Sequence, residues 1–294
     1  MKPPAFEYCV PETIEEALEV LEEHGDEAKL LAGGQSLVPL LNLRVIRPSV
    51  LIDLNRIDGL ARLENGAGPV RIGAMVRQRA LELDGDVHDS LPLLHEALGS
   101  VAHIPIRTRG TLGGSVVHAD PAAEIPAVTL ALRATMHVAG RGGTRAIPAS
   151  EFYLGPFMTG LSPTELLVSV EFPPQAPGAG WAFVEVARVH GAFALVGVAT
   201  LLHAGRDGAL DDVRLALCGV GGTPVEISGL EDVALGGRPS ERLFERVAEH
   251  VRATIEPFSD NQAGAAYRRE VAGAMSARAL RLAATRAGLE IAAA

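Results

Sequence analysis

Cysteine is scarce in this chain of 294 residues, which contains only Cys9 and Cys218. Two thiols cannot supply the four ligands of an iron–sulfur cluster, and they cannot build a disulfide framework. We therefore expect no 2Fe–2S cluster on this chain. The composition instead predicts two reduced, mostly buried thiols in a cytosolic protein.

The chain also lacks basic tracts and long apolar runs. Lys and Arg total 26 against 36 Asp and Glu, a formal net charge of −10. Phosphate-rich partners need a concentrated basic surface, so we expect no nucleic-acid partner. The longest strongly apolar stretch, Gly191 to Leu202, has twelve residues, whereas a membrane helix needs about 20. With no signal or transit peptide recognised, the sequence predicts a cytoplasmic protein without a transmembrane segment.

Apolar residues, glycine and proline are abundant. Hydrophobic residues make up 48%, with 32 Gly and 19 Pro, which is typical of a globular chain with many turns. The length predicts about two domains. The clearest linker is the Pro-rich segment 173–178, so we place a boundary near residue 176. We expect an α+β domain over 1–176, with subdomains of about 1–57 and 58–176, and a second α+β domain over 177–294.

Apolar periodicity predicts the individual elements. Thr13 and Glu16 form a capping box that starts a helix ending at Gly25. In segment 104–115 the apolar residues follow neither the helical period nor the strand period. The predicted strands cover 6–10, 29–32, 50–54, 60–63, 70–74, 134–139, 145–148, 166–172, 181–188, 194–203 and 213–219. The other predicted helices cover 76–83, 91–99, 121–133, 241–255 and 261–287.

Two paired glycines, at 33–34 and 113–114, each follow a strand-like run. A glycine pair lets the backbone approach a ligand closely and point N–H groups at it, which suits a diphosphate. Ser36 and either Ser115 or Thr111 could add hydroxyl donors. Ser36 could also cap a short helix whose positive end favours an anion. Two such loops could hold one diphosphate from both sides; the alternative is two tight turns. The dinucleotide fingerprint G-x-G-x-x-G is absent.

Charged residues near the second glycine pair have two interpretations each. Glu124 follows it on a predicted helix and could accept hydrogen bonds from a sugar or ribityl hydroxyl. It could equally be a solvated first-turn carboxylate favoured by the helix dipole. Arg107 and Arg109 could neutralise phosphate or be solvated loop residues.

The cluster of Ser115, His118 and Asp120 invites two further interpretations that we set aside. The three residues are too close in sequence for a hydrolytic triad, and G-x-S-x-G is absent. His118 and Asp120 have no partnering cluster at metal-ligand spacing. We therefore expect neither catalytic residues nor a metal site here.

Taken together, both glycine loops and their flanks resemble a known family. Residues 30–39 read Leu-Leu-Ala-Gly-Gly-Gln-Ser-Leu-Val-Pro, followed by Leu43-Arg44 and by Leu-Ile-Asp-Leu at 51–54. Residues 106–124 contain Ile-Arg-x-Arg-Gly-Thr-Leu-Gly-Gly-Ser and then His-Ala-Asp-Pro-Ala-Ala-Glu. This pattern resembles the FAD-binding medium subunit of the molybdenum hydroxylases, the family of carbon monoxide dehydrogenase and xanthine dehydrogenase. The resemblance covers essentially the whole chain, including the tail Tyr267-Arg268-Arg269.

The resemblance implies a fold and a cofactor. The fold would be α+β: a two-subdomain FAD-binding domain of the vanillyl-alcohol oxidase or PCMH-like type, then an antiparallel sheet covered by helices, like the CO dehydrogenase flavoprotein C-terminal domain. Gln35 stands where some relatives in the wider fold have a flavin-attaching His, which implies non-covalent FAD.

The same resemblance implies the cofactor-binding residues. The first loop and residues 111–115 would hold the FAD diphosphate, Glu124 would contact the sugar-like portion, and Leu161 would pack near the isoalloxazine. The full implied set is Leu31, Ala32, Gly33, Gly34, Gln35, Ser36, Leu37, Val101, Thr111, Gly114, Ser115, His118, Asp120, Glu124 and Leu161.

The family's division of labour implies partner subunits. A large subunit would hold molybdopterin and oxidise the substrate, and a small subunit would hold two 2Fe–2S clusters. This chain would pass their electrons through FAD to an external acceptor. The resemblance implies that the whole assembly is a dimer of heterotrimers. Two other hypotheses remain open: an autonomous flavoprotein oxidase or dehydrogenase with its own substrate, and a flavin-free scaffold. The residues that choose the substrate (carbon monoxide, aldehyde, purine or N-heterocycle) would lie on another chain, and the acceptor (quinone, cytochrome, NAD or oxygen) is equally open.

One segment departs from the family pattern. Many relatives have Arg-Arg-x-Gly-Asp-Phe-Ala where residues 188–194 read Arg-Val-His-Gly-Ala-Phe-Ala. Val189 and Ala192 thus replace an Arg and an Asp, and Glu185 stands where relatives often have Lys. If this segment lies beside the flavin, these changes bear on the flavin potential and on the acceptor.

Overall fold

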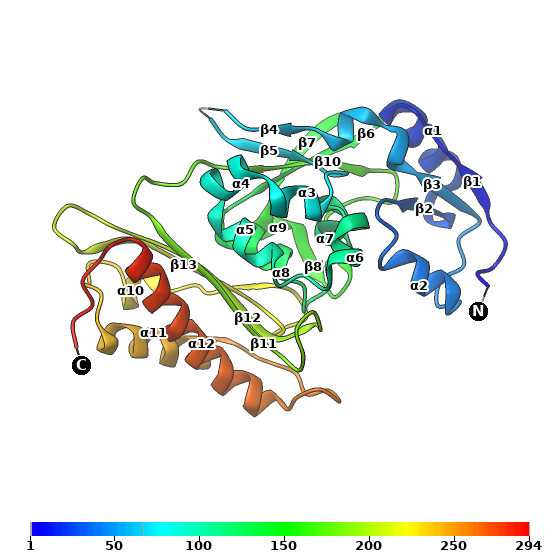
Figure 1. The fold of residues 1–294 in the computed structure, drawn as a ribbon. Coiled ribbons are helices and arrows are strands. Elements are labelled where there is room, and N and C mark those ends of the chain that lie inside the picture. The colour runs from blue at the N-terminus through cyan, green and yellow to red at the C-terminus, as the bar shows by residue number, and fades with distance from the viewer. Residues whose placement is uncertain (1, 67, 294) are drawn as a thin grey trace.

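The computed structural model describes residues 2–66 and 68–293. Three units follow one another along the long axis of the molecule, with the N- and C-termini at opposite ends (Figure 1). Cys9 is partly buried, Cys218 is buried, and both are free thiols. Among the described residues, no helix is both long and apolar enough to cross a membrane.

The N-terminal unit is a small parallel sheet with two helices. Its strand order is β1-β3-β2. The predicted capping box starts α1, because Thr13 Oγ1 accepts from the Glu16 N–H at 3.1 Å. The elements are β1 (Glu7–Cys9), α1 (Ile14–His24), β2 (Ala28–Leu31), α2 (Leu37–Asn42) and β3 (Val50–Asp53), with 3₁₀ turns at Gly25–Glu27, Leu54–Arg56 and Asp58–Ala61.

The central unit is an antiparallel five-stranded sheet, in the order β4-β5-β10-β6-β7, covered by short helices. A separate two-stranded hairpin, β8–β9, lies beside it. The strands are β4 (Leu63–Glu64), β5 (Val70–Gly73), β6 (Thr135–Gly140), β7 (Gly143–Pro148), β8 (Tyr153–Gly155), β9 (Met158–Thr159) and β10 (Leu166–Phe172). The helices are α3 (Gln78–Leu83), α4 (Gly85–Ser90), α5 (Pro92–Leu98), α6 (Ile104–Arg109), α7 (Leu112–His118), α8 (Glu124–Ala131) and α9 (Ala149–Phe152).

Segment 104–115, for which the sequence predicts neither helix nor strand, folds as α6 and most of α7. These helices have six and seven residues, too few turns to show a 3.6-residue period. The expectation that the second glycine pair follows a strand is therefore wrong, because Gly113 and Gly114 lie in the first turn of α7. The helix predicted over 121–133 begins later, at Glu124, because Asp120 Oδ1 accepts from the Ala122 N–H and holds a turn there.

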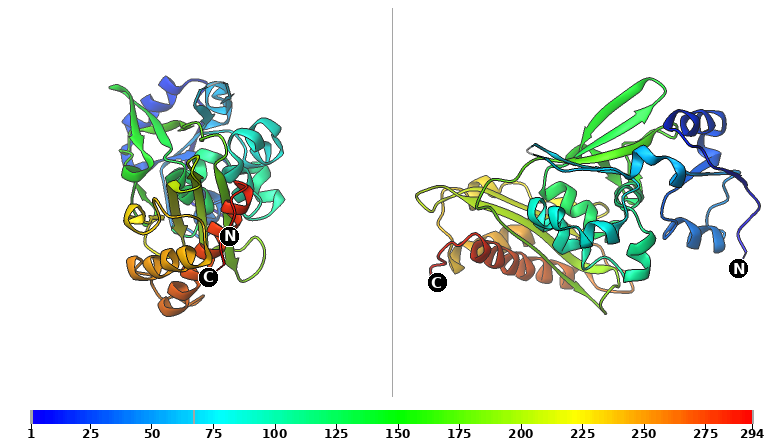
Figure 2. Two further views of the ribbon diagram at one scale, coloured as in Figure 1. Left: turned by 90° about the vertical axis from the view of Figure 1, so that its left-hand side faces the viewer. Right: turned by 45° about the horizontal axis from the view of Figure 1, so that its top comes forward.

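The C-terminal unit is a four-stranded antiparallel sheet in the order β11-β12-β13-β14. Helices α11 and α12 cover one face, and the central unit covers the other (Figure 2). The elements are β11 (Gly180–Ala187), β12 (Ala194–Ala204), β13 (Leu210–Cys218), β14 (Val225–Glu226), α10 (Leu230–Val233), α11 (Glu241–Thr254) and α12 (Ala265–Arg286).

Helix α8 joins the central and C-terminal units. All eight of its residues are buried, as expected for a helix that is apolar all round. It packs against α5 and α7 on one side and against β12 and β13 on the other. The chain thus places the residues that follow the second glycine pair at the contact between two units.

Candidate functional site

The two glycine loops, far apart in sequence, lie against each other. A Cβ atom on Gly33 would sit 2.3 Å from the Arg109 carbonyl oxygen and 2.8 Å from the Gly110 Cα. A Cβ atom on Gly114 would sit 3.8 Å from the Ala32 Cβ. The close backbone approach therefore requires glycine at position 33. It brings a loop of the N-terminal unit to a loop of the central unit.

The first loop connects β2 to α2. Gly34 has a φ of +73°, and the Gln35 side-chain amide donates to the Gly33 carbonyl at 3.0 Å. Leu31 ends the strand and Leu37 begins the helix. The expectation that Ser36 caps α2 is wrong, since its side chain makes no capping hydrogen bond. Its backbone is already helical (φ −99°, ψ −44°), whereas a side-chain cap needs an extended residue.

The second loop is the start of α7. Thr111 has the extended backbone of a cap, and its Oγ1 accepts from the Gly114 N–H at 3.0 Å. Gly113 packs on Ala74: its N–H donates to the Ala74 carbonyl at 2.9 Å, and a Cβ there would meet the Ala74 Cβ at 2.6 Å. Ser115 follows, half-buried, on the same short helix.

This arrangement fits a diphosphate. A side chain at Gly33 or Gly114 would fill the space where the loops approach, so the backbone itself forms the walls of the site. Residues 32–37 and 111–115 include no carboxylate that would repel an anion. The first loop can supply backbone N–H groups and the Ser36 hydroxyl. In the second loop the N–H groups of Gly113 and Gly114 already donate within the chain, so this loop contributes the Ser115 hydroxyl and its close backbone approach.

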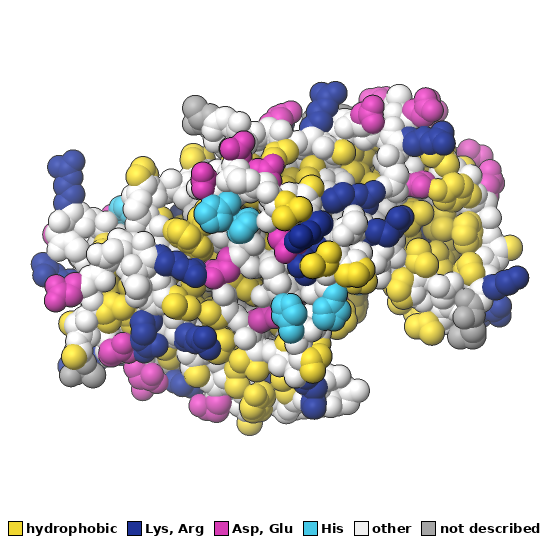
Figure 3. Space-filling view, in the orientation of Figure 1, with side chains coloured by type: hydrophobic (Ala, Val, Ile, Leu, Met, Phe, Trp, Pro, Cys, Tyr) yellow, Lys and Arg dark blue, Asp and Glu magenta, His cyan; other side chains and the backbone are white. Residues whose placement is uncertain are grey.

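Arg107 has a structural role that sequence reasoning missed. Its guanidinium is buried and donates to the Glu82 carboxylate at 2.7 and 2.8 Å. It also donates to the carbonyl oxygens of Val101 at 2.8 Å and Ala102 at 3.1 Å. Both earlier interpretations, a phosphate ligand and a solvated loop residue, are therefore wrong for Arg107. Arg109 is exposed. Several basic side chains lie on the face of the central unit that carries α3 and α6 (Figure 3).

His118 and Asp120 lie where α7 ends. The His118 ring packs 5.1 Å from the Phe157 ring, measured between centroids. Burial lowers the pKa of His118, against the opposing charge of Asp120, so the ring is neutral near pH 7. The described part of the chain contains no group of three or more residues able to hold a metal ion.

Glu124 is buried, with 6% of its surface exposed, so the solvated interpretation is wrong. Burial raises its pKa to about 8, and the charges of Glu185 and Asp120 add to the shift. Glu124 is buried because it lies where α8 packs on the C-terminal sheet. The apolar periodicity of the sequence does not show this contact. Glu185 also has a raised pKa, about 7, because of burial. Its Oε2 atom is buried without a hydrogen-bond partner.

Val101 and Leu161 both pack against the large hydrophobic cluster of the central unit. Val101 is buried and Leu161 is partly buried there, and Val116 of α7 belongs to the same cluster. Their packing within the chain is therefore explained without a ligand. The contacts of Val101 and Leu161 with a flavin stay predictions.

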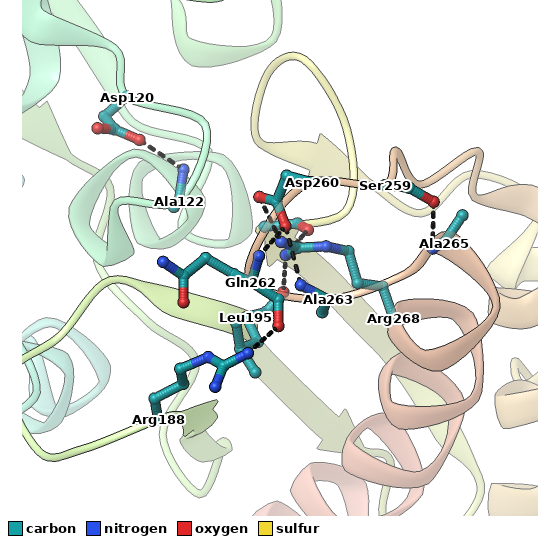
Figure 4. Close-up of polar contacts among 11 residues, drawn as sticks. Asp120, Ala122, Arg188, Leu195, Ser259, Asp260, Gln262, Ala263, Ala265 and Arg268 are labelled. Carbon is teal, nitrogen blue, oxygen red and sulfur yellow. Dashed lines mark hydrogen bonds and ion pairs between the residues drawn. The ribbon is translucent and has the colours of Figure 1, made fainter.

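The tail motif anchors the C-terminal unit through Arg268. This side chain, 2% exposed, donates to the carbonyl oxygens of Leu195 and Gly219 and to the Asp260 carboxylate (Figure 4). The Gly219 N–H in turn donates to the Pro121 carbonyl at 2.8 Å. Arg268 thus ties α12 to the ends of β12 and β13, next to the segment that precedes Glu124.

The divergent segment 188–193 packs on the start of α6. A Cβ on Gly191 would lie 2.4 Å from His103 Cε1 and 2.9 Å from the Ala102 carbonyl oxygen. Arg188 donates to the Gln262 carbonyl at 2.7 Å (Figure 4). The segment therefore connects the C-terminal unit to the residues just before the second glycine loop.

Two family models match consecutive parts of the chain, and relatives match nearly all of it. The family model of the FAD binding domain in molybdopterin dehydrogenase matches residues 4–175, and that of the CO dehydrogenase flavoprotein C-terminal domain matches residues 181–283. The caffeine dehydrogenase subunit beta of a Pseudomonas species is 41% identical, with 97% of each chain covered. The carbon monoxide dehydrogenase medium chain of Hydrogenophaga pseudoflava is 36% identical, with 95% of this chain and 97% of the relative covered.

Solved structures lead to the same family. Carbon monoxide dehydrogenase from Hydrogenophaga pseudoflava superposes with a TM-score of 0.94 at 37% identity, covering 97% of this chain and 99% of that one. Quinoline 2-oxidoreductase from Pseudomonas putida 86 gives 0.93 at 37% identity, covering 98% and 99%. The expected two-domain α+β fold is thereby confirmed. The chain belongs to the FAD-binding medium subunits of the molybdenum hydroxylases, oxidoreductases of the carbon monoxide dehydrogenase and xanthine dehydrogenase type.

Proposed function

We propose that this chain binds FAD non-covalently between its two glycine loops and passes electrons from the 2Fe–2S clusters of a partner subunit to an external acceptor. The observation that carries the proposal is the contact of the two loops, in which Gly33 lies against the backbone of Arg109 and Gly110. Bound FAD supplies the ability to exchange electrons one or two at a time. The chain itself holds and orients the cofactor.

Each loop has a distinct part in holding the cofactor. Residues 31–37 would contact one side of the diphosphate. Gln35 would offer its side-chain amide and has no imidazole ring to which the flavin could attach covalently. The other side of the diphosphate would be contacted by Thr111, Gly114 and Ser115. The Glu124 carboxyl, protonated at neutral pH because of its burial, would donate a hydrogen bond to a hydroxyl of the cofactor. His118, Asp120, Val101 and Leu161 complete the proposed site.

The proposal includes an assembly. A large molybdopterin subunit would oxidise the substrate and a small subunit would carry the clusters, in a dimer of heterotrimers in the cytoplasm. Relatives named as medium chains or as lettered subunits of dehydrogenases support such partners. The linker near residue 176 would divide the FAD-binding domain, 1–176, from the C-terminal domain, 177–294.

The test is flavin binding by the purified chain. Wild type refolded or incubated with FAD should retain about one flavin per chain after gel filtration, as measured from its visible spectrum. Gly114→Asp should lose the flavin, because it places a carboxylate at the diphosphate. Gly142→Asp is the matched control, since nothing lies within 4 Å of a Cβ on Gly142. A wild-type chain that retains no flavin while folded would overturn the proposal.

A second experiment separates the electron-transfer role from the alternatives. The tagged chain is purified from its native host, and co-purifying chains are identified. A large and a small chain with flavin and iron–sulfur absorption support the proposed subunit. Steady turnover of a substrate by the isolated yellow chain would instead favour an autonomous flavoenzyme. A folded, colourless chain that cannot be reconstituted would favour a scaffold.

A further inference from the structure

A polar network outside the glycine loops connects them. The Asn55 side-chain amide donates to the Ala32 carbonyl of the first loop at 3.1 Å. Arg77 donates through NH2 to Asn55 Oδ1, and through NH1 to the Arg109 carbonyl next to the second loop. The Arg109 carbonyl oxygen is the same atom that a Cβ on Gly33 would strike. One side-chain pair therefore binds a carbonyl on each side of the contact.

The network is anchored at its far end. Asp53, the last residue of β3, accepts from the Asn55 N–H at 2.9 Å, from the Asn55 side-chain amide and from the Tyr8 hydroxyl. Burial opposes ionisation of Asp53, but these hydrogen bonds outweigh it and lower its pKa. The carboxylate is thus charged at neutral pH, and it fixes the Asn55 side chain in the orientation that serves both Ala32 and Arg77.

The network joins the N-terminal unit to the central unit. Asp53 and Asn55 belong to the N-terminal unit, whereas Arg77 directly precedes α3 of the central unit. Arg77 also forms an isolated antiparallel bridge with Thr111, the cap of α7. The two units share one hydrophobic cluster, which includes Met75 and Leu166 of the central unit, and the polar network lies outside it. The network thus bonds to the backbone at both loops from outside this shared cluster.

We propose that Asn55 and Arg77 are positioning residues that set the separation of the two glycine loops and thereby the affinity for FAD. The inference rests on the proposed function. Neither residue need touch the cofactor. The Asn55 amide binds the Ala32 carbonyl oxygen, and the Arg77 guanidinium binds the Arg109 carbonyl oxygen. Because the two side chains also bind each other, the pair links the two loops. Removal of the bridge leaves the loops free to separate, so that a single diphosphate contacts both loops in fewer molecules.

The experiment measures the FAD dissociation constant by quenching of flavin fluorescence. Arg77→Ala and Asn55→Ala are each expected to weaken binding about 10- to 100-fold, the usual effect of losing hydrogen bonds to a charged group. The double variant should be little weaker than either single variant, because the two residues act as one bridge. Arg71→Ala is the matched control: Arg71 forms a surface ion pair with Glu171 in the same unit, and its loss should leave the affinity within about 2-fold of wild type.

Conservative variants separate positioning from a general structural role. Asn55→Asp keeps the acceptor for Arg77 but loses the donor to Ala32, and Arg77→Lys keeps one charged donor. Both should bind FAD with intermediate affinity, and the melting temperature without FAD should stay near that of wild type. Wild-type affinity in all four variants would overturn the inference while leaving the proposed function intact. A folded wild type without FAD binding would instead overturn the proposed function. If the alanine variants fail to fold, wild-type affinity in the two conservative variants is sufficient to overturn the inference.

Discussion

The two glycine loops have similar residues, yet Gly34 of the first loop and Gly113 of the second are glycine for different reasons. In the first loop, Gly34 has a φ of +73°, a conformation that costs most other residues energy. In the second, Gly113 lies in a helical turn whose backbone packs directly on Ala74. Similar sequences thus predict a similar ligand, but the physical requirement behind each glycine must be read from its surroundings.

The largest expected effect comes from a methyl group at Gly113. In Gly113→Ala the new Cβ would lie 2.6–2.7 Å from the Cα, Cβ and carbonyl oxygen of Ala74, and backbone atoms cannot move aside. The free energy of unfolding should fall by about 3 kcal/mol, measured by urea denaturation. Gly142→Ala, in open space, is the control. A loss under about 1 kcal/mol at Gly113 would show that the close approach is not rigid.

The second loop also differs from the first in leading to a buried carboxyl. The folded-state pKa of Glu124, about 8, exceeds the ordinary value, so the folded chain without cofactor holds more protons than the unfolded one between these values. Its contribution to stability is complete below about pH 4.5 and is lost as the pH rises toward 8. At about 1.4 kcal/mol for each pKa unit, we expect a loss of about 2–3 kcal/mol between pH 5 and 7.

Glu124→Gln isolates this term. The variant should show a flatter dependence of unfolding free energy on pH between 5 and 8, measured by denaturation at several pH values. His118 works in the opposite direction, because its lowered pKa makes stability rise with pH near 6.5. Since His118 is present in both proteins, the difference between them reports Glu124. Parallel pH profiles for wild type and variant would contradict the assignment.

Sequence patterns predicted the sheets better than the site. Long strands such as β12 and the hairpin of β6 and β7 have a clear period and match the predicted spans within a few residues. Helices α6 and α7 were missed because one or two turns carry too little periodicity. The sequence places Ser36 directly before α2, as a capping residue would be. It makes no capping hydrogen bond because its backbone torsions are helical, and composition does not encode those torsions.

The interactions that were missed are long-range. The buried pair of Arg107 and Glu82, and the network of Asn55 and Arg77, join residues 20 or more positions apart through specific side-chain atoms. An arginine is usually exposed, so sequence alone favoured solvation for Arg107. The burial of Glu124 likewise follows from the packing of α8 on strands β12 and β13, which begin 70 or more residues after Glu124.

Asparagine substitutions sharpen the comparison between the glycines. Gly34→Ala should lower the free energy of unfolding by about 1–2 kcal/mol, because the left-handed backbone crowds a Cβ. Gly34→Asn should recover part of this, since Asn tolerates that region. At Gly113 the larger Asn side chain should be no better than Ala, because the obstacle there is space. Equal ranking of Ala and Asn at both sites, in thermal denaturation, would show that the two glycines serve the same purpose.

The smallest expected difference concerns the two hydroxyl residues at the helix starts. Thr111→Ala removes the acceptor for the Gly114 N–H and should cost about 1 kcal/mol of unfolding free energy. Thr111→Ser keeps the hydroxyl and should restore most of it. Ser36→Ala should change stability by less than about 0.5 kcal/mol, because Ser36 makes no capping bond. Its effect should appear instead in FAD affinity, if the Ser36 hydroxyl contacts the diphosphate. A stability loss at Ser36 equal to that at Thr111 would mean that the side chains of both residues cap their helices. The two loops would then differ only in the reasons for which they need glycine.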